Sequence, residues 1–167
     1  MRMSVFRTAT VLAVIGMTGA GLAVRAHAAA PRDSAAAAYG DIQATLGFVP
    51  SFFKAFPEAG IAGAWDEFKT VQLDPGTALS PKMKQLIGLA VSAQIPCQYC
   101  IYFHTAAARA SGATEEEVRE AVAMAAITRH WSTVLNGMQV DLPTFKHETD
   151  TVLRLAAEKA KAASPTQ

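Results

Sequence analysis

The chain has 167 residues, of which 51% are hydrophobic and 17% charged, and its formal net charge is +1. This length fits one domain, the apolar content excludes intrinsic disorder, and the near-neutral charge gives no basic surface for nucleic acid. Two cysteines are too few for a disulfide-rich scaffold. Alanine, the best helix former, occupies 34 positions, so the composition favours an all-α fold.

The first 28 residues have the layout of a secretory signal peptide. Uncharged residues fill positions 8–24 between Arg7 and Arg25, and Ala26-His27-Ala28 is a small-x-small cleavage site. An uncleaved membrane anchor is the alternative, but a span needs about 20 apolar residues and glycines and threonines dilute this stretch. We expect cleavage near Ala28 and an exported, periplasmic protein with no membrane attachment afterwards.

The rest of the chain predicts helices separated by short breaks. Ser34 caps the first helix and Gly47 ends it, and Pro81 stands at the first position of the clearest one. The expected helical segments are 35–46, a single turn within 51–56, 59–73, 80–95, 96–111, a capping-box helix from Thr114, and 143–163.

Apolar spacing predicts which faces of two of these helices are buried. The residues that share one stripe of the 59–73 helix are Ile61, Ala64, Trp65, Phe68 and Val71. Those that share one stripe of the 80–95 helix are Met83, Leu86, Ile87, Ala90 and Ala93. We expect the large aromatic residues to lie in the core or between subunits; these are Phe52, Phe53, Phe56, Trp65 and Trp131.

The distinctive motif is C-x-x-C-x-x-x-H, formed by Cys97, Cys100 and His104. At about 100° per residue these three side chains fall within an arc of about 60°. The cysteines lie in the first helical turn, where free N–H groups and the helix dipole favour a thiolate. His104 follows Cys100 by one turn and can accept or return a proton. The motif therefore predicts a redox-active thiol pair.

Three other interpretations of the motif compete with redox chemistry. An exported protein can hold the pair as a structural disulfide. A closed zinc site needs four ligands, and three are visible here. Covalent haem attachment is excluded because Ile101 stands where the histidine would have to be. We expect no metal and no cofactor.

The block from Leu79 to Gly137 resembles the carboxymuconolactone decarboxylase family, in its alkyl hydroperoxidase D-like (AhpD-like) branch. The matching elements are a helix, the C-x-x-C-x-x-x-H motif, a small-residue helix, and Gly112-Ala113-Thr114 before a Glu-rich helix. The resemblance implies an all-α, AhpD-like helical bundle over residues 29–163, with residues 164–167 as a tail. It also implies trimers or hexamers that reduce a small hydroperoxide and are recharged by a dithiol reductant.

Two positions depart from the branch that the chain resembles. Gln85 stands where a glutamate takes part in a proton relay, and Tyr99 stands where that relay has a histidine. An amide takes up no proton at working pH, and a phenol is a poor base that can still donate a hydrogen bond. We keep both as candidate site residues, although Gln85 could instead lie on a polar face with Lys84, Gly88 and Ser92.

The order of attack and the reaction class stay open. Helix-terminus electrostatics favour Cys97 as the thiolate, whereas proximity to His104 and the family pattern favour Cys100, with Cys97 resolving. We expect Cys100 to attack the peroxide. The alternatives to peroxide reduction are disulfide exchange, a non-enzymatic oligomer with a structural disulfide, and lactone or decarboxylation chemistry.

Overall fold

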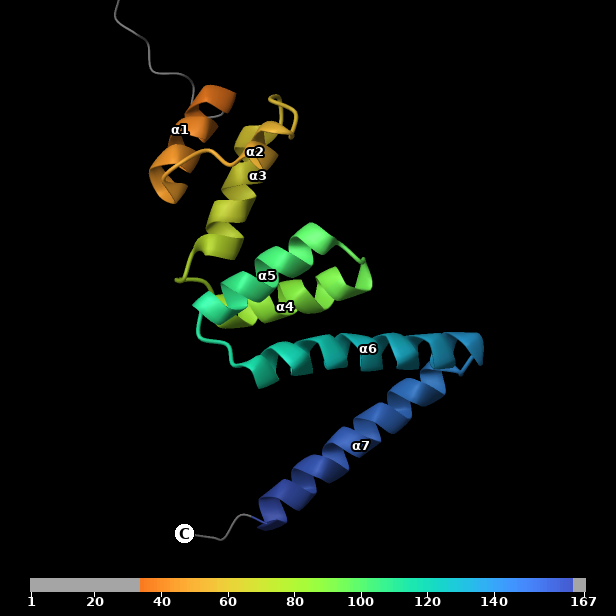
Figure 1. The fold of residues 1–167 in the computed structure, drawn as a ribbon. Helices are drawn as coiled ribbons and strands as arrows, with labels where there is room; N and C mark the ends of the chain where they lie inside the picture. The colour runs from red at the N-terminus through yellow and green to blue at the C-terminus, as the bar shows by residue number, and fades with distance from the viewer. Residues whose placement is uncertain (1–33, 164–167) are drawn as a thin grey trace, which may run out of the picture.

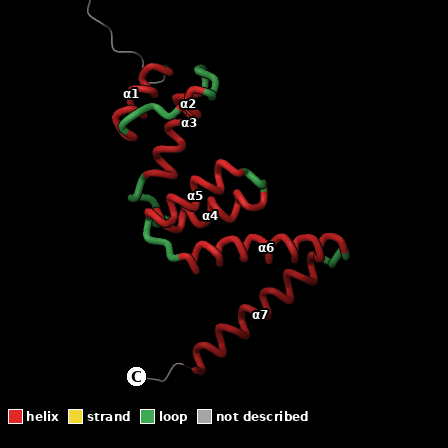
Figure 2. Tube along the Cα trace, in the orientation of Figure 1, coloured by secondary structure: helices red, strands yellow, loops and turns green. Residues whose placement is uncertain are grey.

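The computed structural model describes residues 34–163, so the expected signal peptide lies outside the described residues. The described chain is all-helical, which confirms the expected fold class (Figures 1 and 2). None of its helices is long and apolar enough to cross a membrane. The elements are α1 (Ala35–Leu46), α2 (Ser51–Lys54), α3 (Ile61–Glu67), the π-helix η1 (Phe68–Leu73), α4 (Pro81–Gln94), α5 (Gln98–Ala110), α6 (Glu115–Gly137) and α7 (Leu142–Ala163).

The helix ends follow the local signals in the sequence. The Ser34 hydroxyl accepts a hydrogen bond from the Ala37 N–H at 3.2 Å, and Gly47 ends α1 with φ of 85°. Thr114 and Glu117 form the complete capping box at the start of α6. Each cap satisfies backbone groups that have no partner within the helix, so these boundaries are confirmed.

The segment after Pro57 differs from its prediction in two ways. The α-helix begins at Ile61, and its last turns, from Phe68, are π-helical. A π-helix closes its hydrogen bonds five residues apart rather than four, which shifts the register of the side chains. Ile61 and Trp65 are buried as expected, but Val71 is 61% exposed. The predicted stripe is therefore wrong at Val71.

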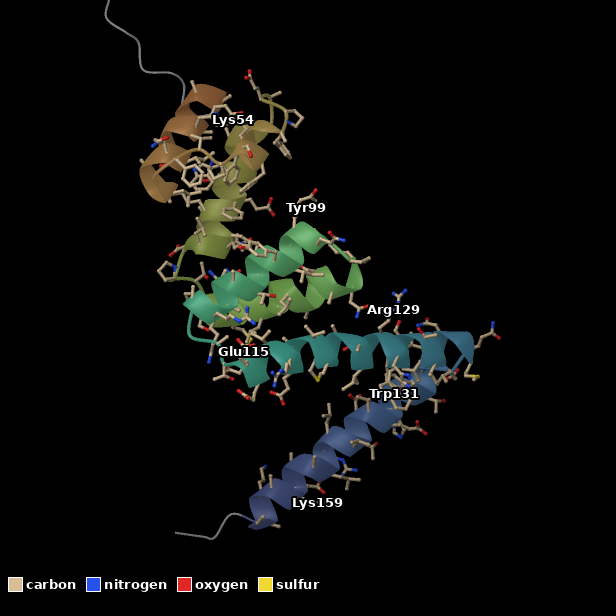
Figure 3. The ribbon with its side chains drawn as sticks, viewed as in Figure 1. Lys54, Tyr99, Glu115, Arg129, Trp131 and Lys159 are labelled. Carbon is tan, nitrogen blue, oxygen red and sulfur yellow. A yellow bond between two sulfur atoms is a disulfide. The ribbon has the colours of Figure 1, made fainter. Side chains whose placement is uncertain are left out.

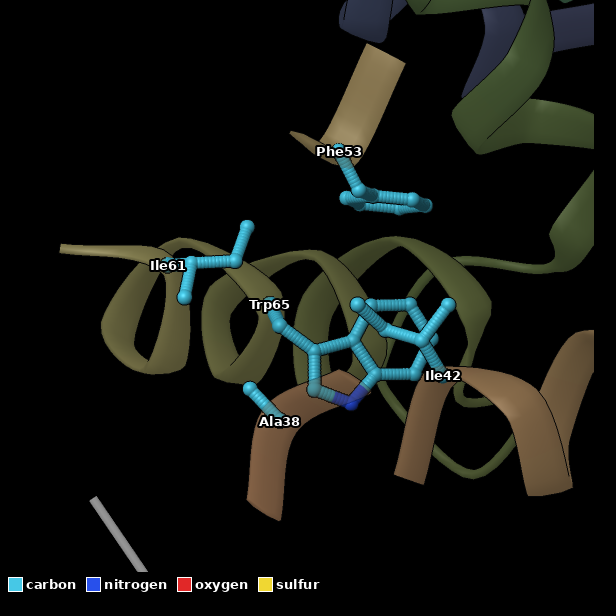
Figure 4. Packing of buried hydrophobic residues seen from close by; sticks show 5 residues of the cluster. All are labelled: Ala38, Ile42, Phe53, Ile61 and Trp65. Carbon is cyan, nitrogen blue, oxygen red and sulfur yellow. The ribbon is translucent and has the colours of Figure 1, made fainter. Parts of the chain in front are cut away.

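The N-terminal helices enclose the first of two small cores (Figure 4). Its buried members are Ala38, Ile42, Phe53, Ile61 and Trp65. The Phe53 ring meets the Trp65 ring edge-on at 5.4 Å between centroids. Asp41 joins α1 to α3 and η1, because its carboxylate accepts hydrogen bonds from Trp65 Nε1 at 2.6 Å and Lys69 Nζ at 2.8 Å.

The second core lies where α4 packs between α5 and α6 (Figure 1). Its buried residues are Leu89, Ala108 and Val118. The Gln94 amide donates to the Ala125 carbonyl at 2.8 Å, which ties the end of α4 to the middle of α6. The α4–α5 pair is an antiparallel hairpin, so its connecting loop brings the cysteines to one end of the bundle (Figure 2).

The buried face of α4 is not the predicted apolar stripe. Gln85, Leu89 and Ser92 are buried, whereas Met83 and Ile87 are 46% and 45% exposed. Gln85 can lie inward because it has a hydrogen-bond partner on α5, described below, and the buried Ser92 hydroxyl donates to the Gly88 carbonyl of its own helix. Met83, Ile87 and Val91 consequently lie on the surface of α4, whereas Leu89 is in the core.

Candidate functional site

The two cysteines form a disulfide at the start of α5. Cys97 is the N-cap of this helix, and its Sγ accepts a hydrogen bond from the Cys100 N–H at 3.2 Å. The Cys97 N–H in turn donates to the Ser92 carbonyl at 3.2 Å, which anchors the cap to the end of α4. The sulfur atoms thus lie where the unpaired N–H groups of the helix gather. Both cysteines are half-buried.

His104 and Gln85 meet across the α4–α5 interface. The distance from His104 Nδ1 to Gln85 Oε1 is 2.8 Å, and Gln85 is only 5% exposed. Since an amide oxygen can only accept, this contact places the imidazole proton on Nδ1. Nε2 then carries the free lone pair. Gln85 does share a side of α4 with Gly88 and Ser92, but that side is buried in the bundle and the histidine is the partner of the Gln85 amide.

Gly88 makes room for the imidazole. A Cβ at this position would lie 2.5 Å from His104 Nδ1 and 2.7 Å from Nε2, closer than any ordinary contact. The ring therefore rests on the bare backbone of α4. Sequence reasoning missed this residue, although a glycine in the middle of a helix, one turn after Gln85, signals a close approach.

The surroundings of His104 favour its neutral form. Burial lowers the pKa of His104 below its usual value. The Phe103 ring meets it edge-on at 5.2 Å, and Phe68 of η1 lies 6.2 Å from Phe103. A neutral imidazole with a free Nε2 can accept a proton from a thiol near pH 7.

Tyr99 lies apart from this arrangement. Its side chain is 89% exposed and points away from the bundle at the start of α5 (Figure 3). The structure therefore brings together Cys97 with Cys100, and Gln85 with His104, but does not bring Tyr99 to the histidine. Tyr102, 79% exposed, lines a shallow apolar groove of about 380 Å³ on the outer side of α5.

Residues 59–141 match the model of the carboxymuconolactone decarboxylase family. The crystal structure of the alkylhydroperoxidase AhpD core from Rhodospirillum rubrum is similar, with a TM-score of 0.57 and 34% sequence identity. That likeness covers 65% of this chain and 82% of the other. A protein described as "Uncharacterized protein 4 in cox locus", from Paracoccus denitrificans, is 44% identical over 52 residues. The match spans 31% of this chain and 47% of that protein's length.

Proposed function

Because this chain belongs to the carboxymuconolactone decarboxylase family, we propose that it is an exported thiol oxidoreductase that reduces small hydroperoxides through Cys97 and Cys100. The observation that carries the proposal is the cysteine pair at the start of α5, one turn before a histidine held neutral with its Nε2 free. The similar Rhodospirillum protein is described as an alkylhydroperoxidase, which supports the same substrate class.

The reaction begins from the reduced pair. His104 Nε2 takes the proton of the Cys100 thiol, and the thiolate attacks one peroxide oxygen. The S–O bond forms as the O–O bond breaks, and the alcohol leaves with a proton. Cys97 then attacks the sulfur of the resulting sulfenic acid, which releases water and forms the disulfide. One hydroperoxide is reduced to an alcohol and water, and two thiols are oxidised.

The cap geometry supports different roles for the two sulfurs. The Cys100 N–H donates to Cys97 Sγ, and this hydrogen bond stabilises negative charge on that sulfur. A stabilised thiolate leaves readily. When an external dithiol attacks Cys100, Cys97 departs as the thiolate, and the second thiol of the reductant completes the transfer of two electrons. In this scheme Cys100 reacts with both the hydroperoxide and the external dithiol, and Cys97 resolves the sulfenic acid.

Gln85 orients the His104 ring, but it cannot pass a proton onwards from the ring. Its amide accepts from Nδ1 but cannot take up a proton itself. The proton that Nε2 receives therefore returns to the leaving alcohol or passes to water. This differs from a relay that ends on a glutamate, and it makes His104 the single general base of the site.

Disulfide exchange with a protein dithiol is the second candidate function. The observation that favours it is the exposed Tyr99 beside Cys100, since exposed aromatic side chains often anchor protein partners. An oxidising compartment would also keep the pair in its disulfide form between encounters. Peroxide reduction and exchange share the same attacking sulfur but differ in their oxidant.

The test uses pre-reduced protein and one equivalent of cumene hydroperoxide. We expect wild-type protein to consume it with formation of the disulfide, Cys97→Ser to stop at a sulfenic acid that dimedone traps, and Cys100→Ser to consume none. Equal consumption by Cys100→Ser would exclude the proposed order. Failure of wild-type protein to react, together with rapid oxidation by a disulfide-bonded protein, would favour exchange.

Export is tested separately from the chemistry. Intact mass spectrometry of the protein recovered from the periplasm, with and without thiol alkylation, reports the cleavage site and the redox state together. We expect a chain that begins at Ala29. A mass that retains residues 1–28 would instead indicate a membrane anchor.

A further inference from the structure

We propose that a pocket on α3 and η1 binds the far end of the organic group of the hydroperoxide, and that this end is uncharged and carries a hydrogen-bond acceptor. The pocket has a volume of about 210 Å³ and is lined by Ala64, Glu67, Phe68, Val71 and Gln72. This inference rests on the proposed function, because it names the substrate class that the thiols reduce. That class is extended, uncharged organic hydroperoxides rather than hydrogen peroxide.

The pocket contains a hydrogen-bond donor that has no acceptor among the described residues. The amide Nε2 of Gln72 is buried and donates to no partner there. A buried donor without a partner costs free energy that an incoming acceptor can recover. The terminal amide torsion of a glutamine is broad, so the N–H groups can turn towards an acceptor inside the pocket. A carbonyl, ether or hydroxyl oxygen is therefore the group that fits beside Gln72.

The π-helical backbone explains why Gln72 lies at this position. η1 begins at Phe68, and the Asp74 N–H donates to the carbonyl of Lys69, five residues earlier, at 3.1 Å. This wider turn changes which side chains face inward, so Val71 is 61% exposed while the end of the Gln72 side chain is buried. Single π-helical turns inside helices are frequently found at functional sites. Here the turn supplies both an apolar side chain and a buried amide to one pocket.

Two phenylalanine rings connect the pocket with the thiol face of α5. Phe68 lines the pocket, and its ring lies 6.2 Å from the Phe103 ring between centroids. Phe103 follows Cys100 by three residues, so the two side chains are neighbours on the helix surface, about 5–6 Å apart between Cβ atoms. Phe103 is 38% exposed. An organic group attached to a peroxide at Cys100 can therefore lie across Phe103 and Phe68 and reach the pocket with its far end.

The length of the organic group decides how many of these contacts form. A compact group such as tert-butyl reaches Phe103 alone, whereas a chain of several carbon atoms crosses both rings. Each CH₂ group that leaves water on binding contributes favourably to the free energy of binding. An extended group therefore gains affinity that hydrogen peroxide, which has no organic group, cannot gain.

The charge of the pocket favours an uncharged end. Glu67 is exposed, and within residues 34–163 it forms no ion pair. None of the residues that line the pocket is basic, and Lys69, the next basic residue along the helix, is paired with Asp41. A carboxylate on the organic group would meet a charge of the same sign. An ester, which offers a carbonyl oxygen without a charge, avoids this repulsion.

The first test measures binding without any redox chemistry. The disulfide form of the protein is labelled with ¹⁵N and titrated with methyl 8-hydroxyoctanoate, which carries the product alcohol at one end and an ester at the other. We expect saturable shifts of the Gln72 side-chain amide signals in NMR spectra. The free acid, 8-hydroxyoctanoate, should bind about fivefold more weakly, and Glu67→Gln should reduce that difference. No saturable shift of the Gln72 signals, or equal affinities for the ester and the acid, would overturn the proposal.

Two variants and one control relate these shifts to the pocket. Ala64→Leu fills the pocket with a side chain that favours helices and should weaken binding of the ester about tenfold or more. Gln72→Leu removes the donor and should weaken it by about two- to tenfold. Gln43→Leu replaces an exposed glutamine of α1 and should keep the wild-type affinity. Circular dichroism reports whether each variant keeps its helices. Wild-type affinity in folded Ala64→Leu or in folded Gln72→Leu would overturn the proposal.

The second test asks whether the pocket serves the thiols. Pre-reduced protein is mixed with methyl 8-hydroperoxyoctanoate or with tert-butyl hydroperoxide, and stopped flow gives the rate of thiol oxidation. Ala64→Leu should slow oxidation by the ester about tenfold and leave the rate with tert-butyl hydroperoxide unchanged. Equal slowing with both would place the effect at the thiols and overturn the proposal. If wild-type protein reacts with neither hydroperoxide, it is the proposed function that fails, and the titration still decides whether the pocket binds the ester.

Discussion

Replacing Gly88 with alanine separates the geometry of the site from the stability of the fold. The new methyl group would lie 2.5 Å from His104 Nδ1, so the ring must turn away and its hydrogen bond to Gln85 must break. Leaving the buried amide without its partner costs about 1–3 kcal/mol, whereas alanine in place of glycine stabilises a helix by about 1 kcal/mol. The free energy of unfolding should therefore fall by about 0–2 kcal/mol. Removal of a positioned base should slow thiol oxidation by about a hundredfold or more.

The matched control is Gly40→Ala in α1, where a Cβ would have nothing within 4 Å. There we expect only the gain in helix propensity, about 0.5–1 kcal/mol, with an unchanged rate of oxidation. Urea unfolding gives the free energies, stopped-flow oxidation by cumene hydroperoxide gives the rates, and the NMR signals of the His104 ring report its displacement. If Gly88→Ala stabilises the protein as Gly40→Ala does and keeps the wild-type rate, the ring does not rest on α4 as described.

Three further predictions concern the caps and the histidine. Thr114→Ala removes the capping box and should cost about 1 kcal/mol in urea unfolding, whereas Thr133→Ala on the exposed side of α6 should cost less; equal losses would contradict the cap. Because burial lowers the pKa of His104, the unfolded chain binds that proton first as the pH falls below about 6.5, and stability declines there. His104→Gln should flatten this decline, and an unchanged slope of unfolding free energy against pH would exclude His104 as its source. Gln85→Glu places a negative charge beside Nδ1 and should raise the pKa of His104 in an NMR titration, whereas Gln85→Leu should not; no rise would refute the contact.

The helix boundaries could be predicted from the sequence because the signals that set them are local. The Ser34 hydroxyl accepts a hydrogen bond from a backbone N–H three residues later in the chain. The side chains of Thr114 and Glu117 each accept a hydrogen bond from the other residue's backbone N–H, within one turn. The position of the two cysteines at the start of α5 could also be predicted, because the C-x-x-C spacing alone places both thiols in one helical turn. None of these features depends on how the helices pack.

The buried face of α4 could not be predicted in the same way. Gln85 finds its partner in His104, nineteen residues later, and that pairing exists only after α4 and α5 have packed. Meanwhile Met83, Ile87 and Val91 lie on the surface of the single chain. An apolar stripe therefore shows which residues are hydrophobic, but it does not show which face of the helix its neighbours bury.

The N-cap of α5 carries a consequence for the choice of variants. Cys97 caps the helix with the same sulfur atom that forms the disulfide to Cys100, whereas serine, threonine, aspartate and asparagine are the residues that natural helices prefer there. Serine at this position keeps the cap and removes the disulfide, while alanine removes both. If Cys97→Ala lowers the melting temperature, the loss of the helix cap contributes to the change as well as the loss of the disulfide. The rates measured on Cys97→Ser are therefore easier to interpret, because that variant keeps the cap.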